Sequence, residues 1–109
     1  MPFSPTHLSQ AHSPTREAVA QLPGAVVLEF GTPWCGHCQR AQPLIESALG
    51  ARTDVAHLKI EDGPGRPLGR SYHVKLWPTL VVLQDGQEVA RVVRPESADA
   101  IGQALSRLN

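Results

Sequence analysis

The chain contains two cysteines, Cys35 and Cys38, and only Gly36 and His37 lie between them. A structural disulfide stabilises most when it closes a long loop, and small secreted proteins generally use several. A single pair with two residues between its cysteines closes no long loop and is not one of several bridges, so a structural disulfide explains it poorly. A thiolate attacks disulfide bonds, and a second thiol nearby can release the mixed disulfide that forms. The pair therefore indicates thiol–disulfide exchange.

The residues around the pair place it where a strand passes into a helix. Residues 25–30 form a nearly continuous apolar run, which is typical of a strand covered on both faces. After Cys38, apolar residues recur every three or four positions as far as Gly50, which predicts an amphipathic helix kinked at Pro43. Cys35 would open this helix, where unpaired N–H groups and the helix dipole favour a thiolate over a thiol.

This placement predicts a division of labour within a redox-active disulfide. We expect Cys35 to attack the substrate disulfide and Cys38, one turn further along the same face, to resolve the mixed disulfide. Gly36 and His37 would tune the pair. A protonated or hydrogen-bonding His37 imidazole would stabilise the thiolate and make the pair a stronger oxidant than a proline would.

Two other interpretations of the pair stay open. A Cys-X-X-Cys pair can be half of a zinc site, although zinc needs about four ligands. The chain has no second such pair, and its remaining histidines follow no ligand spacing (His7, His12, His57 and His73). A purely structural pair is the other alternative. We expect no metal and no cofactor.

The remaining elements alternate between helices and strands. Ser13 and Pro14 predict the cap and first position of a helix that ends near Leu22. Further strands are predicted at 54–60, 79–84 and 87–93, a short helix at 68–72, and a last helix after Ser97, with a tight hairpin turn at Asp85-Gly86. The order predicts an α/β fold with parallel crossover pairing and an antiparallel hairpin edge. We expect a mixed, four- to five-stranded sheet flanked by helices on both faces.

Length and composition predict one ordinary globular domain. The 109 residues divide into a loosely held N-terminal arm at 1–12, with a short edge strand near 3–8, and a folded domain at 13–109. Ten acidic and ten basic residues leave no positive surplus for nucleic acid or an anionic membrane. The apolar runs are too short to span a bilayer, and the first residues show no secretory signal. We therefore expect a cytoplasmic monomer.

The active-site segment, Trp34-Cys35-Gly36-His37-Cys38, together with Pro43, resembles the thioredoxin family. The stretch from residue 72 to 79 resembles the segment that carries the family's cis-proline, here Pro78. The resemblance implies the thioredoxin fold, a cis Pro78 beside the cysteines, and adjacent backbone free to pair with an extended substrate. It also implies disulfide-containing protein substrates and an electron-donating reductase. The Cys-Gly-His-Cys centre itself is similar to that of protein disulfide isomerases, whereas thioredoxins usually have proline in place of His37.

Glu29 interrupts the first apolar strand, where a carboxylate is destabilising unless it has partners. The family has a buried acidic residue here, one methylene shorter. The resemblance implies that Glu29 has a raised pKa and moves the proton of Cys38 during resolution. The alternative is a strand-end glutamate that reaches solvent. His57 stands where the family has a lysine, and we expect it to contact Glu29; alternatively, it is satisfied elsewhere on the sheet face.

Three positions depart from the family pattern. Trp77, before the cis-proline, replaces a smaller residue, and it would either form a substrate platform or pack into the neighbouring helix. Gly31 and Arg94 stand where the family often has Trp and Gly. Arg94 would either obstruct docking or favour the thiolate by its charge. Trp34 keeps the family pattern and is expected to pack over the active-site turn.

The leading interpretation is an enzyme that performs reversible dithiol–disulfide exchange on protein substrates. In a reducing compartment it would act mainly as a reductase. Two alternatives stay open: a disulfide isomerase or oxidase in an oxidising compartment, and a non-catalytic thioredoxin-fold module that binds a partner in its groove.

Overall fold

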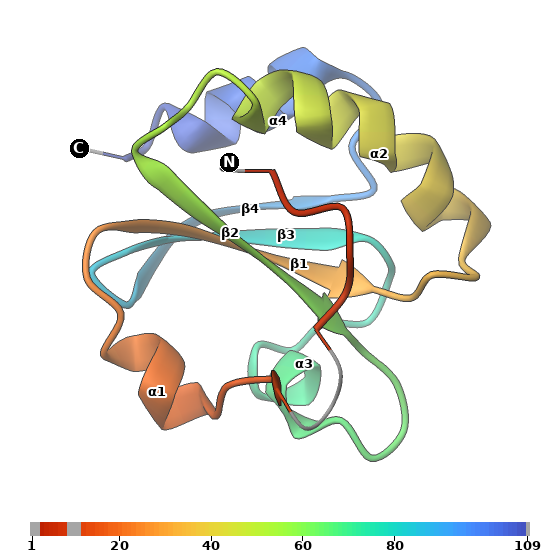
Figure 1. The fold of residues 1–109 in the computed structure, drawn as a ribbon, viewed down its shortest axis with the longest axis vertical. Coiled ribbons are helices and arrows are strands. Elements are labelled where there is room, and N and C mark those ends of the chain that lie inside the picture. Colours follow the sequence, from red (N-terminus) through yellow and green to blue (C-terminus); the bar gives the residue numbers. More distant parts are fainter. Residues whose placement is uncertain (1–2, 9–11, 109) are drawn as a thin grey trace.

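The computed structural model describes residues 3–8 and 12–108. The described residues form eight helices and strands (Figure 1): α1 (Arg16–Ala20), β1 (Ala25–Gly31), α2 (Gly36–Leu49), β2 (Val55–Glu61), α3 (Pro67–Ser71), β3 (Thr79–Gln84), β4 (Gln87–Val93) and α4 (Ala98–Leu105).

The strands of the described chain form one mixed sheet in the order β2-β1-β3-β4. β1 is parallel to β2 and antiparallel to β3, and β3 is antiparallel to β4. In Figure 1, α2 and α4 cover one face of the sheet, while α1 and α3 lie on the other. The mixed sheet with helices on both faces is therefore confirmed, with four strands.

The direction of β3 differs from the crossover pairing that the alternating elements predicted. The β1–α2–β2 unit is a parallel crossover, but β3 starts beside the end of β1, where Thr79 pairs with Phe30. α3 has five residues and rises only about 8 Å. A seven-residue strand such as β2 spans about 23 Å. Because α3 is too short to return the chain along the sheet, β3 runs back antiparallel to β1.

The start of α1 also differs from the prediction. Thr15, rather than Ser13, is the N-cap, and its side-chain oxygen accepts a hydrogen bond from the Ala18 N–H at 3.1 Å. Pro14 therefore precedes the cap instead of occupying the first helical position. Both residues favour a helix start, and the Thr15 hydroxyl forms the N-cap hydrogen bond of α1.

β1 supplies side chains to apolar layers on both sides of the sheet. Val27 packs with α2 and α4, whereas Val26, Leu28 and Phe30 pack on the α1 and α3 side. Every residue of β1 from Val26 onward is buried. Glu29 therefore sits inside the core, on the face that α2 covers.

The described part of the N-terminal arm runs along β2. Leu8 forms a single parallel bridge with Ile60, and its N–H donates to the Lys59 carbonyl at 2.7 Å. The predicted edge strand is thus one bridge rather than a strand. Residues 1, 2 and 9–11 of the predicted arm lie outside the described residues.

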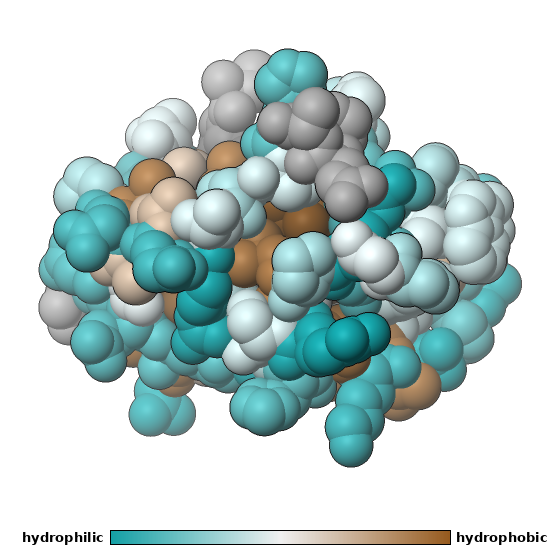
Figure 2. Space-filling model, turned by 90° about the horizontal axis from the view of Figure 1, so that it is seen from below, coloured by the Kyte–Doolittle hydropathy of each residue, from teal (hydrophilic) through white to brown (hydrophobic). Residues whose placement is uncertain are grey.

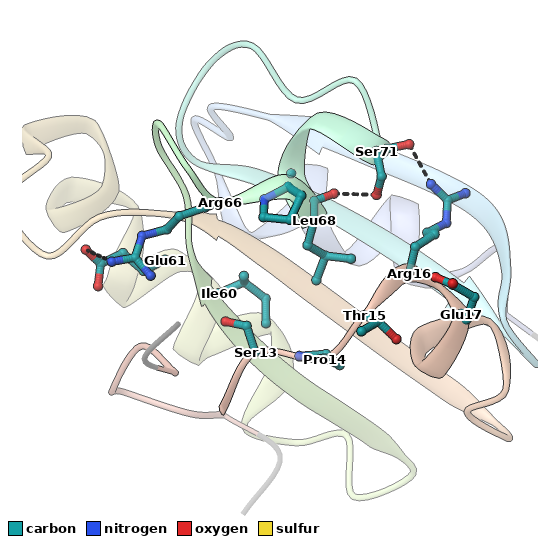
Figure 3. A pocket seen from close by; sticks show the side chains of 12 residues that line it. Ser13, Pro14, Thr15, Arg16, Glu17, Ile60, Glu61, Arg66, Leu68 and Ser71 are labelled. Carbon is teal, nitrogen blue, oxygen red and sulfur yellow. Dashed lines mark hydrogen bonds and ion pairs between the residues drawn. The ribbon is translucent and has the colours of Figure 1, made fainter. Parts of the chain in front are cut away.

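A cavity of about 390 Å³ lies between α1, α3 and the end of β2. Ile60 and Leu68 contribute its apolar side, and Figure 2 shows brown atoms within a hollow of an otherwise largely hydrophilic face. In Figure 3, Arg16 reaches the carbonyl of Ser71 and Arg66 points toward Glu61. None of the lining residues is a predicted site residue, and the cysteines belong to the opposite side of the sheet.

Candidate active site

The two cysteines lie where β1 passes into α2, as predicted. Cys35 is the N-cap of α2, and its Sγ accepts a hydrogen bond from the Cys38 N–H at 3.2 Å. Both residues are free thiols, 8% and 2% exposed respectively. The first-turn N–H groups of a helix favour negative charge, so Sγ of Cys35 occupies the place where a thiolate is stabilised.

The second cysteine is held as a neutral thiol. Burial raises the pKa of Cys38 to about 12, and its interactions with Cys35 and the negative charge of Glu29 add to that rise. Only a backbone hydrogen bond involving Thr32 acts in the opposite direction. At neutral pH, Cys38 therefore needs a proton acceptor before it becomes a nucleophile.

Glu29 is fully buried and bound by donors on both oxygens. Its Oε1 lies 2.9 Å from His57 Nε2, and its Oε2 accepts from Gln42 Nε2 at 2.9 Å. The expected contact between Glu29 and His57 is therefore present. It arises because the parallel register sets Val27 opposite His57, which places His57 and Glu29 on the same face of the sheet.

The pKa of Glu29 was expected to be raised, and this expectation was wrong. Burial does raise it, but hydrogen bonds from His57 and Gln42 and the charge of Lys59 outweigh burial, so that the net pKa lies below the ordinary value. Glu29 is consequently a carboxylate at neutral pH. It is in the form that accepts a proton.

Sequence reasoning missed Gln42 and Lys59. The Gln42 amide donates to both Glu29 Oε2 and the Cys38 carbonyl, each at 2.9 Å, and its oxygen accepts from Lys59 Nζ at 2.5 Å. Lys59 is only 4% exposed. The available signals were the two-residue spacing from His57 to Lys59 on one strand face and the single helical turn from Cys38 to Gln42.

Trp77 and Pro78 form the segment that precedes β3. Their peptide bond is cis, as the resemblance implied. The Trp77 indole N–H donates to Asp62 Oδ2 at 2.8 Å. The ring of Trp77 meets the Trp34 ring edge-on, with centroids 5.7 Å apart. Because the two rings are in contact, they connect the active-site turn to the cis-proline segment. Trp34 is nevertheless 70% exposed.

An exposed apolar surface borders this segment. Trp34, Leu76 and Val93 are the exposed large apolar residues of the described chain. They come from three adjoining places: the turn before α2, the loop before Pro78 and the end of β4, where Val93 pairs with Thr79.

His37 is exposed and favours its neutral form. The positive charge of Arg94 is the main reason that its pKa is lowered, with smaller contributions from desolvation and Arg40. Its Nδ1 lies 3.1 Å from an Arg40 guanidinium nitrogen, which can only donate, so Nδ1 accepts. A Cβ at Gly36 would lie 3.4 Å from Arg40 Nη1. The imidazole is therefore hydrogen-bonded to Arg40, and the surrounding positive charge opposes its protonation. Stabilisation of the Cys35 thiolate by His37 stays a prediction.

Arg94 occupies the left-handed backbone region, with φ of 49°. Its Nε donates to the Trp77 carbonyl at 2.8 Å, and its backbone N–H donates to the Pro78 carbonyl at 2.9 Å. The backbone beside Pro78 was expected to be free for a substrate. Arg94 already uses one of the two lone pairs of the Trp77 carbonyl, so a substrate that paired with this oxygen would share it with the guanidinium.

Gly31 ends β1 at a close approach to the second cysteine. A Cβ at this position would lie 2.5 Å from Cys38 Sγ and 3.9 Å from Trp77 Cβ. No real side chain tolerates the first distance without movement of the sulfur. The absence of a side chain at Gly31 therefore allows Cys38 and Trp77 to pack against the end of β1.

A parallel β1–α2–β2 unit whose strand-to-helix turn carries Cys-X-X-Cys, with a cis-proline opening the next strand, defines a thioredoxin-fold protein. A family model described as Thioredoxin matches residues 7–107, and the chain belongs to the thioredoxin family. Members of this family are thiol–disulfide oxidoreductases that act on disulfide substrates together with reductase partners.

The chain is similar to thioredoxins over nearly its whole length. It is 54% identical to the structure of thioredoxin 2 from Pseudomonas aeruginosa in its reduced form, with 94% of each chain covered and a TM-score of 0.82. It is 33% identical to the thioredoxin of Chlamydia trachomatis, over 77% of this chain and 82% of that protein. Protein disulfide-isomerase A3 of Gallus gallus is 34% identical over 82% of this chain, which spans only 18% of that protein's length.

Within residues 3–8 and 12–108, no three His, Cys, Asp or Glu side chains gather closely enough to hold a metal ion. In the same part of the chain, no helix is long and apolar enough to cross a membrane.

Gly31→Ala tests the close approach at the end of β1. We expect it to reduce the free energy of unfolding of the reduced protein by about 1–3 kcal/mol, because the added methyl overpacks against Cys38. Urea denaturation measures the change. Gly102→Ala is the matched control, since nothing lies within 4 Å of its Cβ and alanine favours a helix. Wild-type stability of Gly31→Ala would contradict the packing argument.

Arg94→Ala tests the electrostatics of His37. A nearby positive charge disfavours the imidazolium, so removal of Arg94 should raise the pKa of His37 toward its ordinary value. An NMR titration of the His37 ring protons measures this change. Arg107→Ala, beyond the end of α4, is the control that should leave the titration unchanged. An unshifted His37 curve in Arg94→Ala would exclude Arg94 as the cause.

Proposed function

We propose that this protein catalyses reversible thiol–disulfide exchange on protein substrates through Cys35. The observation that carries the proposal is the position of Cys35 Sγ at the N-cap of α2, where it accepts the Cys38 N–H. The Cys35 thiolate attacks one sulfur of a substrate disulfide, which forms a mixed disulfide and releases the other sulfur as a thiolate. Cys38 then loses its proton and attacks Cys35 Sγ. The substrate leaves as a dithiol with two electrons gained, and Cys35 and Cys38 are left as a disulfide.

Glu29 is the proton acceptor for the resolving step in this proposal. Its hydrogen bonds keep it ionised, whereas burial keeps Cys38 protonated, so the two groups have complementary forms at neutral pH. Gln42 joins them, because one amide donates both to the Glu29 carboxylate and to the Cys38 carbonyl. The acceptor is thus fixed beside the helical turn whose thiol it serves.

The direction of exchange that we propose is reduction of substrate disulfides. The similarity to a Pseudomonas aeruginosa thioredoxin over nearly the whole of both chains supports this direction. The lowered pKa of His37 also supports it, since a neutral imidazole lends less stabilisation to a thiolate than an imidazolium would. The protein would work as a monomer in a reducing compartment such as the cytoplasm, and an electron-donating reductase would recharge it. The exposed side chains of Trp34, Leu76 and Val93 would contact the substrate.

A second candidate is a disulfide isomerase or oxidase, and the Cys-Gly-His-Cys centre favours it. Equilibration of the cysteine pair with glutathione separates the two directions. A reduction potential of about −270 mV supports the reductase, whereas about −180 mV supports the isomerase.

Cys35→Ser tests catalysis at the first cysteine, with insulin as the disulfide substrate and dithiothreitol as the reductant. We expect the rate of insulin reduction to fall to that of dithiothreitol alone, because the serine hydroxyl does not attack a disulfide. Cys38→Ser is the matched comparison, and it should instead accumulate the mixed disulfide at Cys35. Equal activity of wild type and Cys35→Ser would contradict catalysis at Cys35 and would favour a non-catalytic binding module.

Glu29→Gln tests the proton acceptor. We expect resolution of the mixed disulfide to slow on the order of 10²-fold, with the attack by Cys35 nearly unchanged, since only the second step needs the base. Rapid mixing with a fluorescent peptide disulfide measures both steps. The negative charge of Glu29 raises the pKa of Cys38, so a purely electrostatic role would make Glu29→Gln resolve faster. Exposed Glu46→Gln on α2 is the control, and an unchanged lifetime of the mixed disulfide in Glu29→Gln would exclude the assignment.

A further inference from the structure

His57 is held between the active-site carboxylate and the described part of the N-terminal arm, residues 3–8. The Ser4 N–H donates to His57 Nδ1 at 2.8 Å, and the Ser4 hydroxyl donates to the His57 carbonyl at 3.0 Å. The Phe3 ring stacks on the imidazole, with centroids 5.5 Å apart. The His57 side chain is completely buried by these contacts and by Glu29 on its other side.

The hydrogen bonds of His57 assign its tautomer. A backbone N–H can only donate, so Nδ1 must carry a lone pair toward Ser4. The proton of the neutral ring is therefore on Nε2, which donates to Glu29 Oε1 at 2.9 Å. A second proton on Nδ1 would point at the Ser4 N–H, and that contact would be repulsive.

Other titratable groups face the same site from each element around it. Glu29 comes from β1, Lys59 from β2, Cys38 from α2, and His7 from the arm, where it interacts through charge with His57, Glu29, Lys59 and Glu61. Lys59 also depends on the arm, because its Nζ donates to the Pro5 carbonyl at 3.1 Å as well as to Gln42. Residues 3–8 therefore contact both basic side chains that act on Glu29.

We propose that Ser4 is a positioning residue for the exchange reaction: its backbone N–H keeps His57 neutral with the proton on Nε2, and so sets how strongly Glu29 accepts the proton of Cys38. This inference rests on the proposed function of Glu29. The physical reason is the charge of the ring. A neutral donor leaves Glu29 a better base than an imidazolium would, because a full positive charge stabilises the carboxylate against protonation.

The test compares Ser4→Pro with Ser4→Ala. Proline removes the N–H, whereas alanine keeps it and removes only the hydroxyl, so alanine is the matched control. Nitrogen-15 NMR of the ring reports the protonation of His57 directly. We expect Nδ1 to be unprotonated in wild type and Ser4→Ala, and to carry a proton in a larger share of the Ser4→Pro molecules under the same conditions.

The same variants are compared in the rate of resolution as a function of pH. Once the amide is gone, no donor opposes a proton on Nδ1, so the ring of Ser4→Pro should carry a positive charge more often and Glu29 should accept the proton of Cys38 less readily. We expect resolution of the mixed disulfide to be slower in Ser4→Pro than in Ser4→Ala at the same pH. The rate of attack by Cys35 should be unchanged in Ser4→Pro. A variant whose active site was merely loosened would be slower in both steps.

Three results would overturn the inference. These are a wild-type His57 with its proton on Nδ1, a Ser4→Pro variant with wild-type ring protonation and pH profile, and a Ser4→Ala variant that behaves like Ser4→Pro. The first needs no variant and therefore does not depend on the folding of Ser4→Pro. A failure of the proposed function has a different signature: the ring of Ser4→Pro changes protonation, while Glu29→Gln resolves at the wild-type rate.

Discussion

The burial of one carboxylate constrains the whole active site. Glu29 lies in the central strand with no solvent contact, and an ion in that position is stable only where donors replace the lost water. His57 and Gln42 provide those donors, one to each oxygen. Each donor is held in turn by a further contact, from Ser4 to His57 and from Lys59 to Gln42. The parallel pairing of β1 with β2 and the first turns of α2 thus both supply donors to the Glu29 carboxylate.

The cysteine pair uses the same strand for a different purpose. β1 ends at Gly31, whose missing side chain lets the Cys38 sulfur approach the strand, and α2 begins one short turn later. The same atom therefore caps the helix and is the proposed nucleophile, because the sulfur of Cys35 accepts the hydrogen bond that a serine or aspartate oxygen accepts at other helix starts. The local rule that starts the helix also positions the reactive atom.

Local rules explain which features could be predicted from the sequence. The cysteine pair, the strand-to-helix turn and the Asp85-Gly86 hairpin depend on residues near one another in the chain, and periodicity or turn chemistry reveals them. The direction of β3, the contacts of Gln42 and the binding of Ser4 to His57 join distant residues. The prediction of a raised pKa for Glu29 was wrong for the same reason. The sequence shows that Glu29 lies in an apolar strand and is buried, but it does not show the donors that compensate for burial.

The residues around a short motif decide its chemistry as much as the motif does. A histidine between two cysteines is expected to stabilise a thiolate by carrying a proton, yet Arg94 and Arg40 lower the pKa of His37 and favour the neutral ring. Both arginines come from outside the four-residue centre, and Arg94 also binds the carbonyl before the cis-proline. The positive charge near the cysteine pair is therefore carried by guanidinium groups, which stay charged, rather than by an imidazole, which titrates near neutrality. The isomerase-like centre is therefore surrounded by arginines that move the titration of its histidine to lower pH.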